Sequence, residues 1–386
     1  MPPRLERFGA VTIYDVAEVI ALDSMGLVSN EAVYGIPPQQ LAEQASRTFI
    51  VIPTRDEDPL LLEGVISSVP LPSPVVLVSA SSLEPLDFYS HELEVIRTHA
   101  RLTGRRALAV HQHDPAWREA LEGTPLKAML EGDAVRRGKG EGMVLGVLVA
   151  SWLGAQFVGF IDADNYVPGA VHEYALAYYT GFSLLNSRFS MVRVAWYYKG
   201  KPDSSHMLFR KWGRVSYHAN SLLNLSVSLC RRVETNVIKT TNSGEHALSM
   251  ELALSLPWAG GYAVEAFQLV YLLEACYVQL EGGGKRCPFL PAGVKVLQVE
   301  TRNPHIHSEK GEAHLARMAA ESLGALYHSA LALEKVRAKV RGVLSENYYE
   351  EEPPAPRIYE LEGINAKKAV STYLERSLLA FDSRRG

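Results

Sequence analysis

The sequence predicts an α/β fold with a doubly wound, mostly parallel sheet. Four apolar runs have the composition of buried strands: 48–53, 74–79, 107–111 and 157–161. Helix-like segments at 91–102 and 143–154 lie between them, and polar residues follow the strands directly. Strands that alternate with helices in this way form parallel sheets covered by helices on both faces.

The second half of the chain has a more mixed pattern. Residues 190–198 and 294–300 alternate like strands. Four further segments are predicted to be helical: 245–254, 264–277, 312–343 and 366–381. An acidic, proline-rich linker precedes the last of them. The last helical segment therefore forms a C-terminal extension of the fold. We expect this tail either to pack on its own domain or to form a partner-binding or dimer-forming arm.

The composition is typical of an ordinary globular protein. The chain has 386 residues, of which 47% are hydrophobic and 21% charged, and its net charge of −4 provides no basic field for nucleic acid. The three cysteines lack framework spacing, which favours reduced thiols in a cytoplasm. The apolar stretch 143–161 reads as a buried helix and strand rather than a membrane span. We therefore expect a cytoplasmic protein without nucleic-acid or membrane partners.

The most informative motif is Asp162-Ala163-Asp164-Asn165, which follows the predicted strand 157–161. Two carboxylates at the end of a strand lie at the mouth of an α/β sheet, where ligands bind. Such oxygen donors suit a divalent cation that carries a substrate's phosphates. The alternative is a polar turn in which Asp164 or Asn165 caps the next helix.

Two other loops could contact a nucleotide. The polar loop 54–58 follows the first strand, so Glu57 or Asp58 could accept hydrogen bonds from a guanine base; the alternative is a solvated surface loop. In the segment 138–142, glycines alternate around Lys139. Glycine allows close approach of a phosphate and lysine supplies charge, although such turns are also common on surfaces.

Three segments of the second half could complete a site. Residues 240–246 offer small donors before a predicted helix, either as an anion site or as a helix cap. Glu265 follows a glycine turn, where it could orient an acceptor hydroxyl or be a first-turn glutamate that the helix dipole stabilises. His305 and His307 would point the same way in an extended segment, and either could join Asp164 at a metal.

Taken together and in this order, these motifs resemble the mannosyl-3-phosphoglycerate synthases and, more distantly, the glucosyl-3-phosphoglycerate synthases. The resemblance extends from about residue 48 to about residue 343, and its most specific parts are 162–174 and 303–311. It implies a GT-A-like (Rossmann-like) fold and transfer of mannose from GDP-mannose to the 2-hydroxyl of 3-phosphoglycerate, with retention of configuration. The product would be the precursor of the compatible solute mannosylglycerate. The resemblance also implies a homodimer and a divalent metal, with Mg²⁺ favoured over Mn²⁺, Co²⁺ or Zn²⁺.

We divide the chain into an N-terminal segment (1–47), a nucleotide-sugar-binding half (48–240), an acceptor-binding half (241–345) and a linker with a tail (346–386). The resemblance carries no motif for the linker and the tail. The implied donor-binding residues are Pro53, Thr54, Arg55, Glu57, Ser81, Lys139, Asp162, Ala163 and Asp164. The implied acceptor-binding residues are Thr241, Asn242, Ser243, Gly244, His246 and Arg302. The implied metal ligands are Asp164, His307 and His305, and the implied catalytic residues are Asp164, Lys139 and Glu265.

Some alternatives stay open at this level. The positive charge that holds the anionic acceptor would come from His246 and from Arg210, Arg231 or Arg232. Retention requires one of two routes. The acceptor attacks from the same face of the sugar that the leaving group departs from, which we favour, or the reaction passes through a covalent intermediate on Glu265. The alternative functions are a glucosyl-3-phosphoglycerate synthase and a sugar-phosphate nucleotidyltransferase, although the latter would place a glycine-rich loop directly after the first strand.

Overall fold

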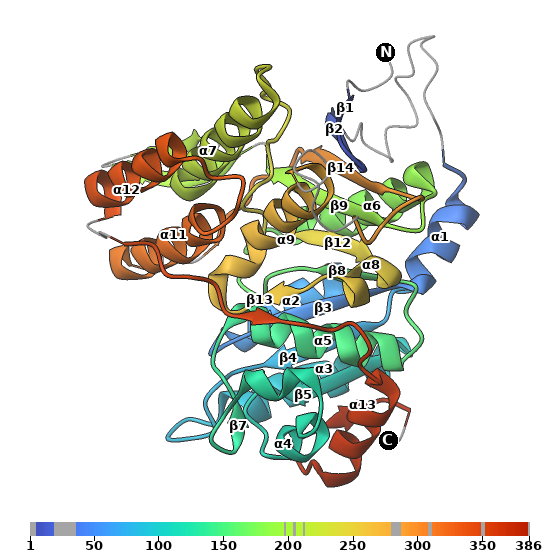
Figure 1. Cartoon of the computed structure of the whole chain (residues 1–386). Coiled ribbons are helices and arrows are strands. Elements are labelled where there is room, and N and C mark those ends of the chain that lie inside the picture. The colour runs from blue at the N-terminus through green and yellow to red at the C-terminus, as the bar shows by residue number, and fades with distance from the viewer. Residues whose placement is uncertain are drawn as a thin grey trace.

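The computed structural model describes residues 5–18, 36–196, 198–203, 206–210, 213–278, 287–307, 311–348 and 352–384. A ten-stranded sheet runs through the molecule in the order β1-β2-β14-β9-β12-β8-β3-β4-β5-β16 (Figure 1). Its strands are β1 (Leu5–Phe8), β2 (Val11–Glu18), β3 (Thr48–Thr54), β4 (Val75–Ser79), β5 (Ala107–His111), β8 (Phe157–Phe160), β9 (Ser190–Trp196), β12 (His246–Ser249), β14 (Val294–Thr301) and β16 (Phe381–Asp382). Three short ribbons flank the sheet: β6 (Leu130–Glu131) with β7 (Ala134–Val135), β10 (Lys199–Asp203) with β11 (His206–Arg210), and β13 (Trp258–Ala259) with β15 (Ile358–Tyr359).

Helices cover both faces of this sheet. One face carries α1 (Pro38–Arg47), α2 (Pro59–Ser68), α3 (Phe88–Thr103) and α6 (Pro168–Leu185). The other core joins α4 (Ala116–Leu121), α5 (Lys139–Trp152), α7 (Arg214–Arg231), α8 (Met250–Ser255), α9 (Val264–Leu273), α11 (Glu312–Tyr327), α12 (Glu334–Tyr348) and α13 (Ala366–Arg376). The predicted α/β class, with a mostly parallel, doubly wound sheet, is confirmed.

The central strands form where the apolar runs predicted them. β3 pairs in parallel with β4 on one side and β8 on the other, and β4 pairs in parallel with β5. Every residue of β4 and β5 is buried, which explains why these runs are apolar throughout rather than alternating. The carboxyl ends of β3, β4 and β8 therefore meet at one edge of the sheet.

Several predicted segments are wrong in type or extent; the helix predicted at 366–381, for example, ends at Arg376 and is followed by strand β16. The segment 245–254 begins as strand β12, which lies antiparallel between β8 and β9, and becomes helical only at Met250. A short apolar run that is buried on both faces cannot be told from a helix by its pattern. The segment 312–343 is two helices, α11 and α12, because the chain turns at 328–333 to lay both against α7. The predicted loop at 138–142 instead forms the first turn of α5.

The two ends of the chain extend the sheet. The hairpin β1–β2 pairs through β2 with β14, and β16 of the tail pairs antiparallel with the edge strand β5. Helix α13 packs against α4 and α5, so the tail lies on its own domain (Figure 1). The boundaries at 47/48, 240/241 and 345/346 remain predictions, although strands from all four segments belong to one sheet.

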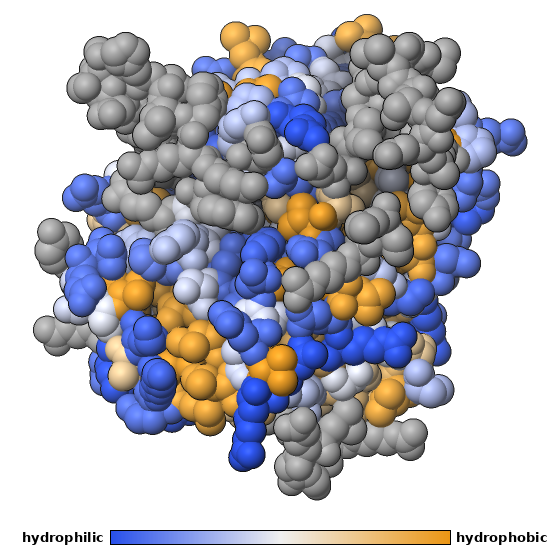
Figure 2. Space-filling model, turned by 90° about the horizontal axis from the view of Figure 1, so that it is seen from above, coloured by the Kyte–Doolittle hydropathy of each residue, from blue (hydrophilic) through white to orange (hydrophobic). Residues whose placement is uncertain are grey.

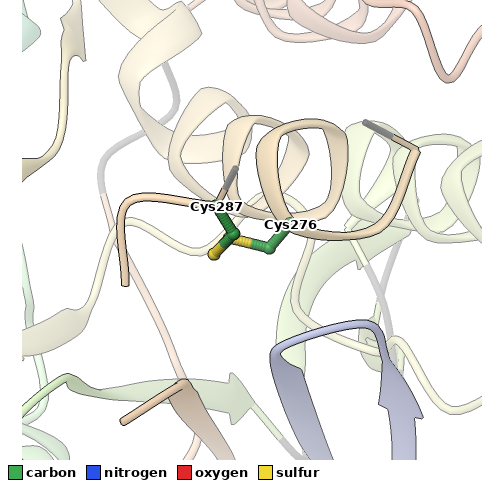
Figure 3. Close-up of a disulfide and its surroundings, with 2 residues drawn as sticks. All are labelled: Cys276 and Cys287. Atoms are coloured by element: carbon green, nitrogen blue, oxygen red, sulfur yellow. A yellow bond between two sulfur atoms is a disulfide. The ribbon is translucent and has the colours of Figure 1, made fainter. Parts of the chain in front are cut away.

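The expectation of reduced thiols is wrong for two of the three cysteines. Cys276, in the π-helical turn Glu274–Val278 after α9, forms a disulfide with Cys287 (Figure 3). Their Cα atoms are 4.6 Å apart although 11 residues separate them in sequence. Both side chains are buried at the edge of the larger core, so the pairing follows from the return of the chain toward β14.

The outer surface is mostly hydrophilic on the face that Figure 2 shows, with a separate group of apolar residues toward the lower left of that view. Within the described residues, no helix is long and apolar enough to cross a membrane.

Candidate active site

A cavity of about 600 Å³ opens at the carboxyl ends of β3 and β8. This volume is within the range of small-molecule sites. Its walls come from the start of α5, the loop before β12, the turn before α9 and the beginning of α11. Thirteen of the residues predicted to form the site line it: Pro53, Thr54, Arg55, Glu57, Lys139, Asp162, Ala163, Asp164, Asn242, Gly244, Glu265, His305 and His307.

An ion-paired lysine stands at the centre of the cavity. The Lys139 ammonium donates to Asp162 Oδ2 and to Glu265 Oε1, each at 2.7 Å. Burial alone would lower the pKa of Lys139, but the carboxylates of Asp162, Glu265 and Glu245 outweigh it and raise that pKa well above the ordinary value. Lys139 is therefore a permanent positive charge whose position two carboxylates determine.

Gly244 lies directly against this cluster. A Cβ atom at this position would lie 2.9 Å from Lys139 Nζ and 3.0 Å from Asp162 Oδ2. The absence of a side chain thus allows the loop before β12 to touch the charged groups, as close backbone approach requires.

Glu245 is a fourth titratable group of the site. Its side chain is fully buried, and Asn165 Nδ2 donates to its Oε1 at 3.3 Å. Burial, followed by repulsion from Asp162, raises the pKa of Glu245 to about 8. Its second oxygen has no hydrogen-bond partner among the described residues. This carboxyl group can therefore hold or accept a proton near neutral pH.

Asp164 and the histidine loop are held together by the backbone. Asn165 and His307 form an antiparallel bridge, and Tyr166 N donates to the Ile306 carbonyl at 2.9 Å. Asp164 is 8% exposed and faces the cavity with His307. The predicted same-side arrangement of His305 and His307 agrees with the 5.2 Å between their ring centroids.

The His305 ring is more tightly packed than the His307 ring. Its ring stacks on Trp196 with 4.5 Å between centroids, and its Nδ1 shares a hydrogen bond of 3.0 Å with the Tyr174 hydroxyl. His305 is 5% exposed. These contacts fix the ring through one nitrogen, so His307 is the more accessible of the two imidazoles.

The loop after β3 is shaped by a residue that does not reach the cavity. Ser81 is buried, accepts from the Asp56 backbone N–H at 2.7 Å and donates to Glu92 Oε1 at 2.6 Å. Asp56 has a left-handed backbone with φ of 54°, and its carboxylate accepts from Ser82 N. Ser81 thus holds the turn that presents Arg55 and Glu57, rather than lining the site itself.

Four of the residues predicted to bind the acceptor lie outside the cavity wall. Thr241, Ser243 and His246 are buried, and the Ser243 hydroxyl is within hydrogen-bond distance of the Val194 and Glu245 carbonyls. The predicted helix N-terminus at this loop is absent, because β12 follows. Arg302 is exposed, and Glu173 accepts from its backbone N–H.

The chain matches known proteins along most of its length. The family model described as mannosyl-3-phosphoglycerate synthase matches residues 1–372. Two relatives named mannosyl-3-phosphoglycerate synthase, from Aeropyrum pernix and Pyrococcus furiosus, are 47% and 36% identical to the chain. The first alignment covers 98% of this chain and 97% of the relative, and the second covers 92% of each.

The chain belongs to the mannosyl-3-phosphoglycerate synthase family.

Solved structures of related synthases are more distant. The mannosyl-3-phosphoglycerate synthase of Rubrobacter xylanophilus has 21% identity and a TM-score of 0.46 over 79% of this chain and 80% of that one. The glucosyl-3-phosphoglycerate synthase of Mycobacterium tuberculosis in complex with phosphoglyceric acid has 21% identity and a TM-score of 0.48, covering 76% and 84%.

In this member of the family, several residues that the sequence reasoning missed line the cavity. They are Gln112, His113, Arg137, Trp196, Lys199, Glu245, Tyr262, His314 and Arg317. Lys199 Nζ lies 4.2 Å from the centre of the Trp196 ring, and Arg317 donates to Glu321 at 2.7 Å. Trp196 could have been found because it lies near the end of the predicted strand 190–198. His314 and Arg317 carry no such signal, because only the fold brings α11 to the sheet.

The donor atoms fit a divalent cation that is shared with a ligand. Asp164 supplies a carboxylate and His307 supplies an imidazole, and both line the cavity. No group of three His, Cys, Asp or Glu residues in the described part of the chain could hold a metal alone. A cation bound by one or two carboxylates that completes its coordination with substrate phosphates matches this arrangement.

Proposed function

We propose that this chain transfers mannose from GDP-mannose to the 2-hydroxyl of 3-phosphoglycerate, with retention of configuration. The observation that carries the proposal is the contact of Lys139 with Asp162 and Glu265 beside Asp164, within one cavity. A fixed ammonium next to paired carboxylates suits a diphosphate leaving group and its counter-ion.

The donor half of the reaction would use the edge formed by β3 and β8. Of the two predicted guanine acceptors, Glu57 lines the cavity and would accept hydrogen bonds from the base, whereas Asp58 caps α2. A divalent metal held by Asp164 and His307, with Mg²⁺ favoured, would neutralise charge on the diphosphate. Lys139 supplies a permanent charge to the same oxygens and requires no reorganisation during the reaction.

The acceptor half would use the opposite wall of the cavity. 3-Phosphoglycerate carries a phosphate and a carboxylate, so its site needs cations. His246 is buried and neutral, Arg231 and Arg232 do not line the cavity, and the side chain of Arg210 lies outside the described residues. We therefore propose Lys199 and Arg317, together with Asn242, as the groups that hold the acceptor.

The chemical step is proposed to occur on one face of the sugar. The acceptor 2-hydroxyl attacks mannose C1 as the bond to the GDP oxygen breaks, and its proton passes to the departing phosphate. Glu265 is the one carboxylate we nominate for the alternative covalent route. Its Oε1 accepts from Lys139, so its role in the same-face route is to orient that ammonium.

The test is GDP release from the purified protein given GDP-mannose, with and without 3-phosphoglycerate, and with Mg²⁺ or EDTA. We expect release that requires both 3-phosphoglycerate and metal, and Asp164→Ala should abolish it. Asp133→Ala is the matched control, because Asp133 is an exposed carboxylate that pairs with Arg118 outside the cavity. Release without 3-phosphoglycerate, or none at all, would contradict the proposal.

Donor sugar, metal and assembly are tested in the same preparation. GDP-glucose in place of GDP-mannose measures sugar preference, and Mn²⁺, Co²⁺ or Zn²⁺ in place of Mg²⁺ measures metal preference. Light scattering measures the proposed homodimer. Formation of a sugar nucleotide from a sugar phosphate and GTP would instead favour the nucleotidyltransferase alternative.

A further inference from the structure

The C-terminal chain crosses the molecule beside the active site. We call residues 352–361 the strap, since they run from the end of α12 toward α13 across the front of the sheet (Figure 1). Within the strap, Ile358 and Tyr359 pair antiparallel with Ala259 and Trp258. The strap therefore lies alongside the segment that leads into α9 and Glu265.

A buried carboxylate joins the strap to the first turn of α5. Glu141 is fully buried, two residues after Lys139. Its Oε1 accepts from the Tyr359 hydroxyl at 2.7 Å and from Arg357 Nη2 at 3.3 Å, and its Oε2 accepts from Gly261 N at 2.8 Å. Such a carboxylate is tolerable only when it is well paired, so this network fixes the groups around it.

The turn before α9 is held by three acceptors in succession. Gly260 N donates to the Arg357 carbonyl at 2.8 Å, Gly261 N to Glu141, and Tyr262 N to Glu321 Oε2 at 2.6 Å. Gly261 has a left-handed backbone with φ of +61°. The turn leads directly into α9, which carries Glu265.

These contacts place the Glu141 carboxylate between α5 and the turn before α9, the two elements that meet at Lys139. Glu141 lies on α5 with Lys139, and it accepts from the turn that positions Glu265. Lys139 and Glu265 are 126 residues apart in sequence and meet at 2.7 Å. The distance between α5 and the turn therefore sets the position of the ammonium in the cavity.

We propose that Tyr359 is a positioning residue for sugar transfer: by holding Glu141, the strap fixes Lys139 against Glu265 at the donor cavity. The inference rests on the proposed function, since it assumes that Lys139 acts on the donor phosphates. Tyr359 does not line the cavity. Its effect therefore passes through Glu141 rather than through contact with substrate.

The test is Tyr359→Phe, which removes one hydroxyl and keeps the ring. We expect kcat to fall roughly tenfold, as for the loss of one hydrogen bond to a charged group, with the KM for 3-phosphoglycerate nearly unchanged. Arg357→Met should act in the same direction but less, because Arg357 is half-exposed. Tyr373→Phe is the matched control: this buried tyrosine of the same C-terminal region accepts a hydrogen bond from Ser377 and stacks on Trp117.

A double-mutant cycle distinguishes positioning from general stability. If Tyr359 acts through Lys139, adding Tyr359→Phe to Lys139→Gln should cause no further loss of kcat or of GDP affinity. Losses that multiply, or a Tyr359→Phe kcat equal to that of the Tyr373→Phe control, would overturn the inference. An inactive wild type would instead mean failure of the proposed function, so the two failures are distinguishable.

Discussion

At the scale of single residues, the site depends on one ammonium and the groups that surround it. Lys139 contacts Asp162 and Glu265, and Gly244 lies beneath all three. Glu245 adds a carboxyl group whose pKa is raised to about 8 by burial and by repulsion from Asp162. The sequence motifs supplied most of these groups, but their mutual contacts come from the fold.

Gly244→Ala should lower activity with little effect on folding. The new Cβ would lie within 3.0 Å of Lys139 Nζ and Asp162 Oδ2, which are ends of side chains that can move. We expect kcat to fall about tenfold or more as the ammonium shifts, since misplacement of about 1 Å can cost 10²-fold. Gly64→Ala is the control, because no atom lies within 4 Å of its Cβ position. Equal activity of the two variants would contradict this role.

Glu265→Gln should leave appreciable activity. If attack occurs on the leaving-group face, the variant loses only the orienting contact with Lys139, and we expect a decrease of roughly 10- to 100-fold. A nucleophilic Glu265 would instead cost 10⁴-fold or more. Steady-state kinetics measures the difference, and trapping a glycosyl adduct on a carboxylate would disprove same-face attack.

His246 should make stability depend on pH. Burial, then Arg193 and Lys139, holds the pKa of His246 well below its ordinary value. The unfolded chain binds this proton near pH 6.5, so below that pH the unfolded state carries more protons and the folded state loses stability. The contribution of the neutral His246 to the free energy of unfolding is therefore fully present above about pH 6.5 and is lost as the pH falls below it.

His246→Gln should therefore flatten the pH dependence of the free energy of unfolding between pH 7 and 5. In the variant, we expect the free energy of unfolding to fall less steeply with decreasing pH than in the wild type, by up to about 1.4 kcal/mol per pH unit. Urea unfolding at both pH values measures it, with His91→Gln on the exposed side of α3 as the control. An unchanged slope would rule out His246 as the titrating group.

At the scale of elements, buried polar side chains connect segments that are distant in sequence. Arg193 of β9 is fully buried and donates to the carbonyls of Thr240 at 2.8 Å, Thr241 at 3.3 Å and Glu265 at 2.6 Å. It therefore links the loop before β12 to the first turn of α9. Burial lowers the pKa of Arg193 to about 10, so the side chain remains charged at neutral pH.

Arg193→Met should destabilise the protein severely. The change leaves three buried carbonyls without this donor, each at a cost of about 1–3 kcal/mol, so we expect the free energy of unfolding to fall by about 3 kcal/mol or more. Denaturant unfolding measures the loss. Arg188→Met is the control, because the exposed Arg188–Glu251 pair contributes at most about 1 kcal/mol. A small effect at Arg193 would show that the loop is held by other contacts.

At the scale of the whole molecule, the ends of the chain complete the structure. The hairpin β1–β2 and the strand β16 extend the two sides of the sheet, and the disulfide ties the end of α9 to the segment before β14. The double variant Cys276→Ser/Cys287→Ser should lower the free energy of unfolding by about 2–4 kcal/mol, since it frees a short loop in the unfolded chain. Turnover should be unchanged, because neither cysteine lines the cavity.

Thermal unfolding with and without reductant measures this contribution. Reductant should lower the melting temperature of the wild type and not that of the double variant, and Cys230→Ser should behave as the wild type. An identical response of all three proteins would contradict a stabilising disulfide.

The sequence by itself determined the central strands, the α/β class, the family and most of the groups at the cavity. Local composition is sufficient for these features, because a buried parallel strand is apolar throughout and is followed by polar residues at the ligand-binding edge. Only the tertiary structure decided that 246–249 is a strand, that Thr241 and Ser243 do not line the cavity, and that Cys276 meets Cys287. It also brought Arg317 to the cavity and Tyr359 to Glu141. Those outcomes depend on contacts between residues far apart in the chain, and no local pattern encodes them.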